Sequence, residues 1–90
     1  MLKLFQYSED FGRMGTLEGI FVAKESEVAK IMGKEVYFGE ILGKHSEITT
    51  EIIPENIKIV SEDQAFIKKL CEIFKTRSIS GINPLEFLED

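Results

Sequence analysis

The stretch SEDQAFIKKLCEIFK, residues 61–75, constrains the fold most, because it predicts an amphipathic helix. Ser61 is a good N-cap, and Gln64 three residues later completes a capping box. Lysines in the later turns suit the negative end of the helix dipole. The apolar stripe has the spacing i, i+3, i+4, i+7 and consists of Ile67, Leu70, Cys71 and Phe74. We therefore expect this helix to lie on one face of a sheet.

The other clear pattern is a series of short β-rich runs. Residues 2–7, 16–23 and 56–61 are rich in the aliphatic and aromatic side chains that favour strands. Two more runs flank Gly43–Ser46 and predict a β-hairpin with its bend at that position.

Two further helices complete the prediction. Residues 24–33 predict a short helix, with Gly33 where a C-cap favours a left-handed residue. Asn83 before Pro84 predicts the start of a last helix of one or two turns. The order of elements predicts an α+β fold: a small antiparallel sheet of about five strands with two main helices and a short C-terminal helix. We expect residues 1–90 to form a single domain.

Composition excludes several classes of protein. The net charge of −5 argues against direct nucleic-acid binding, which needs a basic face, but leaves open a partner protein with a basic surface. A single cysteine excludes an internal disulfide and a multi-cysteine metal site. No apolar run approaches the ~18 residues of a membrane span, and the N-terminus lacks a signal-peptide core. We expect a cytoplasmic protein without membrane contact.

The predicted hairpin has two different faces. With the bend centred on Lys44-His45, Leu42 pairs with Glu47 and Phe38 with Glu51, and alternate side chains share a face. The expected core face carries Tyr37, Gly39, Ile41, Ile48, Thr50 and Ile52. The second face mixes apolar and acidic side chains: Val36, Phe38, Glu40, Leu42, Glu47, Thr49, Glu51 and Ile53.

The second face has three interpretations. It is a homo-oligomer interface, a groove for a ligand or partner, or a partly solvated face without a role. The interface residues expected on it are Val36, Phe38, Glu40, Leu42 and Glu51. A register slip of one residue would exchange the two faces.

The segment GEILGKHS is similar to a phosphate-binding P-loop but departs from that pattern. Phe38 occupies the position of the first glycine, His45 occupies the Ser/Thr position, and a β-rich run follows instead of a helix. His45 is the only histidine, so the sequence predicts no metal site. No residue is assigned a catalytic role, although Glu40 and Glu51 form a candidate carboxylate pair. We expect no cofactor and no enzymatic activity.

Two polar loops predict a site for a small anionic ligand. The hairpin tip offers Lys44, His45 and Ser46, and the tail offers Arg77 and a helix start at Asn83. If these loops converge, within one chain or across a dimer, they form an anion pocket. Base stacking on that ligand is assigned to Tyr37 or Phe38.

The runs GIFVAKESEVAKIMGKEVYFGEILGKHSEI and SGINPLEFL together resemble small uncharacterised proteins of phages and mobile elements with a YFGE-x-LGKHSE hairpin core. The resemblance covers residues 19–48 and 80–88. It implies a counter-defence role, in which such a protein binds a host defence protein or sequesters its nucleotide signal.

The leading hypothesis is a non-enzymatic, homo-oligomeric binding protein that sequesters a small anionic, nucleotide-like signal. The alternative is a protein-interaction inhibitor whose acidic–apolar sheet face blocks a basic surface on a partner. A hydrolase that uses Glu40 or His45 is the third class.

Overall fold

The computed structural model describes residues 1–43 and 47–88, and over these it contains two α-helices, three short 3-10 helices and six strands. In chain order, the elements are β1 (Leu2–Asp10), η1 (Gly12–Met14), β2 (Thr16–Lys24), α1 (Glu25–Ile31), β3 (Glu35–Gly39), β4 (Ile48–Glu51), η2 (Pro54–Asn56), β5 (Ile57–Ser61), α2 (Gln64–Phe74), β6 (Ser78–Gly81) and η3 (Pro84–Phe87). None of the helices in these ranges is long and apolar enough to cross a membrane.

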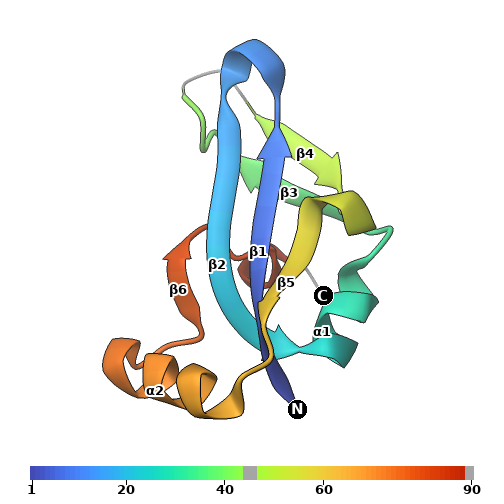
Figure 1. The fold of residues 1–90 in the computed structure, drawn as a ribbon. Coiled ribbons are helices and arrows are strands. Elements are labelled where there is room, and N and C mark those ends of the chain that lie inside the picture. The colour runs from blue at the N-terminus through green and yellow to red at the C-terminus, as the bar shows by residue number, and fades with distance from the viewer. Residues whose placement is uncertain (44–46, 89–90) are drawn as a thin grey trace.

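The strands form two antiparallel sheets (Figure 1). The larger sheet has the order β5-β1-β2-β6, and β3 pairs with β4 in a separate two-stranded sheet. The predicted α+β class is confirmed, with six strands where about five were expected. The additional strand is β6, Ser78–Gly81, which lies in the tail that was predicted to form a polar loop.

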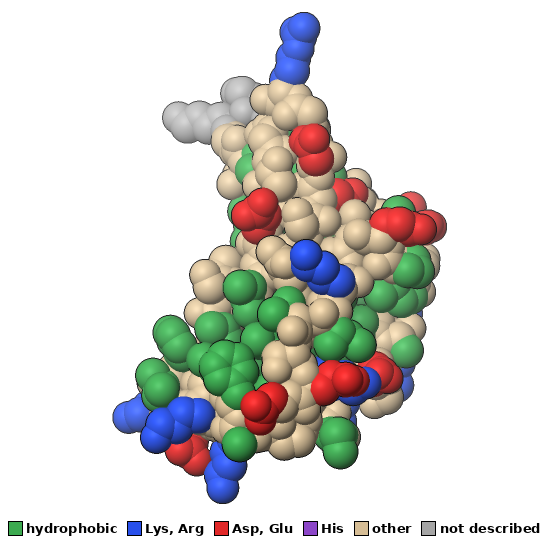
Figure 2. Space-filling model, viewed as in Figure 1, with side chains coloured by type: hydrophobic (Ala, Val, Ile, Leu, Met, Phe, Trp, Pro, Cys, Tyr) green, Lys and Arg blue, Asp and Glu red, His purple; other side chains and the backbone are tan. Residues whose placement is uncertain are grey.

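Helix α2 lies against one face of the larger sheet. Leu4 and Val22 are partners in neighbouring strands, and both are buried in a small cluster with Ile67 of α2. Figure 2 shows that hydrophobic side chains nevertheless remain at the surface on this side, around α2. The helix therefore covers only part of this face.

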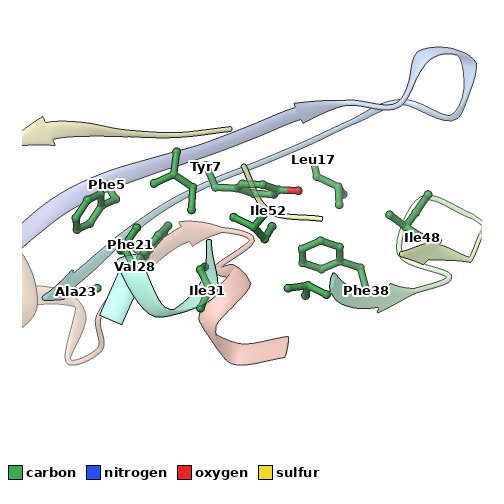
Figure 3. Close-up of a cluster of buried hydrophobic side chains, with 12 residues drawn as sticks. Phe5, Tyr7, Leu17, Phe21, Ala23, Val28, Ile31, Phe38, Ile48 and Ile52 are labelled. Carbon is green, nitrogen blue, oxygen red and sulfur yellow. The ribbon is translucent and has the colours of Figure 1, made fainter. Parts of the chain in front are cut away.

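The main core lies on the opposite face of the same sheet. Phe5 and Phe21, each one residue along from the α2 cluster, point the other way, because strand side chains alternate. Figure 3 shows aromatic and aliphatic side chains from β1, β2, α1 and the β3–β4 pair meeting there. The buried members are Phe5, Tyr7, Leu17, Phe21, Ala23, Val28, Ile31, Val36, Phe38, Ile48, Ile52 and Ile57.

Helix α2 begins two residues later than its predicted capping box requires. Ser61 ends β5, whereas the side chain of Asp63 accepts hydrogen bonds from the backbone N–H groups of Ala65 and Phe66, at 3.1 and 3.2 Å. Asp63 is thus the N-cap, and the prediction of Ser61 is wrong. The reason is that pairing with Leu4 holds Ser61 in the sheet.

The predicted pairing of the hairpin is also wrong. Glu35 lies opposite Glu51 and Tyr37 opposite Thr49, a different register from one centred on Lys44-His45. Strand β3 ends at Gly39, whose φ is +73°, and β4 begins only at Ile48, so the connection is longer than a tight turn. Val36 and Phe38, which the predicted register placed on the second face of the hairpin, therefore point into the core.

Candidate functional site

The outward side of the β3–β4 pair is an exposed surface of acidic and amphipathic side chains. Its members, which we call the β3–β4 outer face, are Glu35, Tyr37, Thr49, Glu51 and Ile53. On this face Tyr37 is 46% exposed and Ile53 37% exposed, so the acidic side chains stand beside apolar and aromatic surface. An acidic–apolar sheet face thus exists, as expected, but with different residues on β3.

Three of the predicted interface residues are not on this surface. Val36 is buried, and Phe38 is only 6% exposed, with its ring 5.9 Å from that of Tyr7 and 4.9 Å from that of Phe87. Leu42 is partly buried against the main core. Their assignment to an open face is wrong: the actual register turns β3 over and so buries Val36 and Phe38, whereas Leu42 follows β3 and packs against the core. Phe38 is therefore also wrongly placed for stacking on a ligand.

The two remaining interface residues lie apart. Glu51 is exposed opposite Glu35 at the start of β3, whereas Glu40, which is also exposed, follows the far end of that strand. The two ends of a five-residue strand are about 13 Å apart. Glu40 and Glu51 therefore do not form the predicted carboxylate pair.

Two carboxylates face each other across the outer face. Directly opposite side chains of an antiparallel pair have their Cβ atoms about 5 Å apart, and like charges at this position destabilise the sheet. Within the described residues, neither Glu35 nor Glu51 forms an ion pair. The repulsion would fall if a cation bound between them.

A hollow of about 260 Å³ adjoins these side chains. Lys34, Glu35, Tyr37 and Thr49 line it, together with Phe87 and Leu88 from the end of the described chain. The hollow combines apolar surface with the carboxylate of Glu35 and the ammonium group of Lys34, and its apolar part suits the aliphatic stem of a side chain with a charged tip.

Hydrogen bonds beneath the outer face hold β4 to the larger sheet. The Thr50 hydroxyl donates to Glu9 Oε2 at 2.6 Å, and the Tyr7 hydroxyl donates to Glu9 Oε1 at 2.9 Å. Thr50 follows Thr49 in the chain, so its side chain points inward while the outer face points to solvent. The outer face is thus supported by a polar network as well as by the core.

The buried hydroxyl of this network makes stability depend on alkaline pH. Burial, and then the hydrogen bond to Glu9, raise the pKa of Tyr7 well above its usual value. The folded protein therefore holds this proton more tightly than the unfolded chain does. The resulting stabilisation is complete below the unfolded pKa of about 10 and is lost as the pH rises towards the folded pKa.

We expect the free energy of unfolding to fall above about pH 10, with Tyr7 contributing up to about 1.4 kcal/mol per pH unit. Tyr7→Phe should lack this contribution and show a shallower decline. Urea unfolding of both proteins at a series of pH values from about 8.5 to 11.5 measures the two slopes. Equal slopes would show that Tyr7 does not hold its proton in the fold.

The tail residues predicted to bind an anion have internal partners. Arg77 lies 3.4 Å from Glu27 in an ion pair. Asn83 is buried; its side-chain amide donates to Ser78 Oγ at 2.9 Å, and its carbonyl oxygen accepts from the backbone N–H of Leu85 at 3.0 Å. The interpretation of Asn83 as a helix cap is confirmed, whereas its binding of a ligand stays a prediction.

The flank of the hairpin loop and Arg77 are far apart in one chain. Leu42 lies beside Gly15, since a Cβ built there would be 3.5 Å from Leu42 Cδ2. The carbonyl of Arg77 accepts a hydrogen bond from the backbone N–H of Val22. Val22 lies seven residues after Gly15 along the same extended segment. Seven strand residues span about 23 Å. Lys44, His45 and Ser46 themselves lie outside the described residues, so their roles stay predictions.

Metal-binding side chains and the single cysteine are the two remaining candidates for reactive chemistry. In residues 1–43 and 47–88, no group of three or more His, Cys, Asp or Glu side chains is placed to hold a metal ion. Cys71, on the apolar stripe of α2, is partly buried and lines a second hollow of about 360 Å³ between α2 and Leu2. Comparison of the chain with family models, curated proteins and solved structures finds no match in any of the three.

Glu35 of the outer face was not among the site residues predicted from the sequence. The signal that indicates it is the alternation Glu35–Val36–Tyr37–Phe38, in which every second residue is aliphatic or Phe. Matching that alternation to Ile48, Thr50 and Ile52 on the other strand assigns Glu35 and Tyr37 to the outside.

Proposed function

We propose that this protein is a non-enzymatic protein-interaction module and that its β3–β4 outer face binds an arginine-containing basic surface on a partner. The observation that carries the proposal is the pair of opposed carboxylates, Glu35 and Glu51, beside the half-exposed ring of Tyr37. Two like charges directly opposite each other in a sheet do not stabilise the fold.

The chemistry of this face suits a guanidinium group. Arginine can form two parallel hydrogen bonds to a carboxylate, and its planar group can lie over an aromatic ring. Glu35 and Tyr37 lie on the same face of β3, two residues apart, so one arginine can reach both. The neighbouring hollow and Ile53 offer apolar surface for the stem of the same or an adjacent side chain.

A nine-residue polyarginine peptide is a direct probe of this proposal. We expect calorimetry at low salt to show binding that weakens steeply as salt is added. Glu51→Lys should reduce the affinity at least about fivefold, which corresponds to roughly 1 kcal/mol. The same substitution should raise stability by about 0.2–1 kcal/mol, because it replaces a like-charge pair by an opposite-charge pair.

Glu72→Lys on α2 is the matched control, since it makes the same change of charge at an exposed site away from the outer face. It should weaken binding less than twofold. If the two variants weaken binding equally, the peptide responds to net charge and the proposal is wrong. If Glu51→Lys binds as tightly as the wild type, the outer face is not the site.

Sequestration of a small anionic signal stays a prediction. The described residues offer it less support, because Arg77 is paired with Glu27 and Phe38 is buried. A host defence protein as the partner, which the family resemblance implies, stays a prediction as well. Titration with a panel of cyclic nucleotides, with Lys44→Ala as the control, tests the ligand directly.

A further inference from the structure

The apolar side of α2 is wider than the surface that the sheet covers. Ile67 is 1% exposed, but Phe66, Ile73 and Phe74 are 48%, 62% and 49% exposed. With the partly buried Leu70, these three exposed side chains form a continuous strip at positions i, i+4, i+7 and i+8, which we call the α2 patch. In Figure 2 the hydrophobic side chains around α2 continue onto the sheet above it.

The area of the α2 patch fits a small dimer interface. A fully buried Phe removes roughly 150–250 Å² from water, so two half-exposed Phe side chains and Ile73 offer on the order of 300 Å². Partly exposed Ile20 and Ile79 on the neighbouring strands extend it. The smallest stable interfaces bury about 600 Å² per partner, of which roughly 340 Å² is apolar.

The spacing of the α2 patch is self-complementary. Phe66 and Phe74 lie four residues on either side of Leu70. If a two-fold axis passes beside Leu70, a second α2 runs antiparallel to the first. Phe66 of each copy then faces Phe74 of the other, and the two Leu70 side chains meet at the axis.

The charges at the ends of α2 favour the same arrangement. Asp63 caps the start of the helix and Lys75 follows its end, while the nearby Glu62 and Arg77 form ion pairs with Lys3 and Glu27 of the same chain. Antiparallel pairing sets the acidic end of each helix beside the basic end of the other, and it also opposes the two helix dipoles. A parallel pairing would bring like charges together at both ends.

We propose that the α2 patch binds a second copy of this chain and forms a symmetric dimer through antiparallel α2 helices. This places the oligomer interface on α2 and not on the hairpin face. The dimer presents two β3–β4 outer faces, so a partner with two basic sites would bind with increased avidity. The dimer does not depend on the proposed function, and either can fail alone.

Light scattering and sedimentation of the wild type should show a monomer–dimer equilibrium in the micromolar range. Ile73→Glu places a carboxylate in the patch and should raise the dimer dissociation constant at least tenfold. Ala65→Glu adds the same charge at an exposed position outside the patch and should change it less than twofold. Far-UV circular dichroism checks that both variants are folded. A wild type that stays monomeric at about 1 mM overturns the proposal.

Oxidative cross-linking tests the antiparallel register without relying on loss of binding. In a Cys71→Ala background, a mixture of Phe66→Cys and Phe74→Cys chains should form a disulfide between the two species. Neither chain alone should do so, because like positions lie about 12 Å apart along the paired helices. Disulfides within a single species indicate parallel helices and contradict the proposal.

Binding to anionic vesicles by a chain that remains monomeric would assign the α2 patch to a lipid surface instead and equally overturn the proposed dimer.

Discussion

Phe38→Ala is expected to lower the free energy of unfolding by about 3–5 kcal/mol, the usual loss for a buried Phe. The ring of Phe38 lies between Tyr7 of the larger sheet and Phe87 of η3, so its removal leaves a cavity where three elements meet. The total free energy of unfolding of a small domain is roughly 5–15 kcal/mol, so this variant should lose much of its stability. Urea unfolding followed by circular dichroism measures the change.

Tyr37→Ala, at the neighbouring position, is the control. Tyr37 is 46% exposed on the outer face, so we expect a loss below about 1.5 kcal/mol. The two variants together test which way β3 faces. If Tyr37→Ala destabilises the protein more than Phe38→Ala does, β3 is turned over and the hairpin register centred on Lys44-His45 is correct after all.

Gly19→Ala should have a comparably large effect for a different reason. Gly19 pairs with Gly81 of β6, and a Cβ at Gly19 would lie 1.8 Å from the carbonyl oxygen of Ile82. The obstacle is backbone, so the edge of the sheet has to move. The hydrogen bond from Ile82 N–H to the Glu18 carbonyl, at 2.9 Å, would be lost with that movement. We expect a loss of about 3 kcal/mol or more.

Gly12→Ala separates this clash from the general cost of replacing a glycine. Gly12 has a φ of +66°, but nothing lies within 4 Å of a Cβ built there, so the expected cost is about 1–2 kcal/mol of backbone strain. Thermal unfolding of both variants gives the comparison. A midpoint for Gly19→Ala equal to that of the wild type would contradict the close approach of β2 and β6.

The fold class was predictable because local signals agree with the tertiary structure. The apolar stripe on α2 and the left-handed Gly33 after α1 can each be recognised from a short stretch of sequence. Strand β6 was not predictable in this way. Its sequence SISG has little intrinsic strand preference, and the backbone of Ser78–Gly81 is extended because it pairs with β2.

The register of the hairpin depends on a feature that local patterns do not contain. A tight bend at Gly43–Ser46 predicts one pairing, but the left-handed Gly39 ends β3 early and lengthens the connection. Packing in the core determines which residues of β3 face inward, and these are Val36 and Phe38. For this reason Glu51 was assigned to the outer face from the sequence, while Glu35 was not.

The most direct test of the proposed function is the location at which the polyarginine peptide binds. A titration followed by backbone amide resonances of the 15N-labelled protein should shift the signals of Glu35, Tyr37, Glu51 and Ile53 most strongly. The signals of α1 and α2 should move little. Largest shifts at the acidic residues of α1, Glu25 and Glu27, or small shifts spread over the whole chain, would contradict a binding site on the β3–β4 outer face.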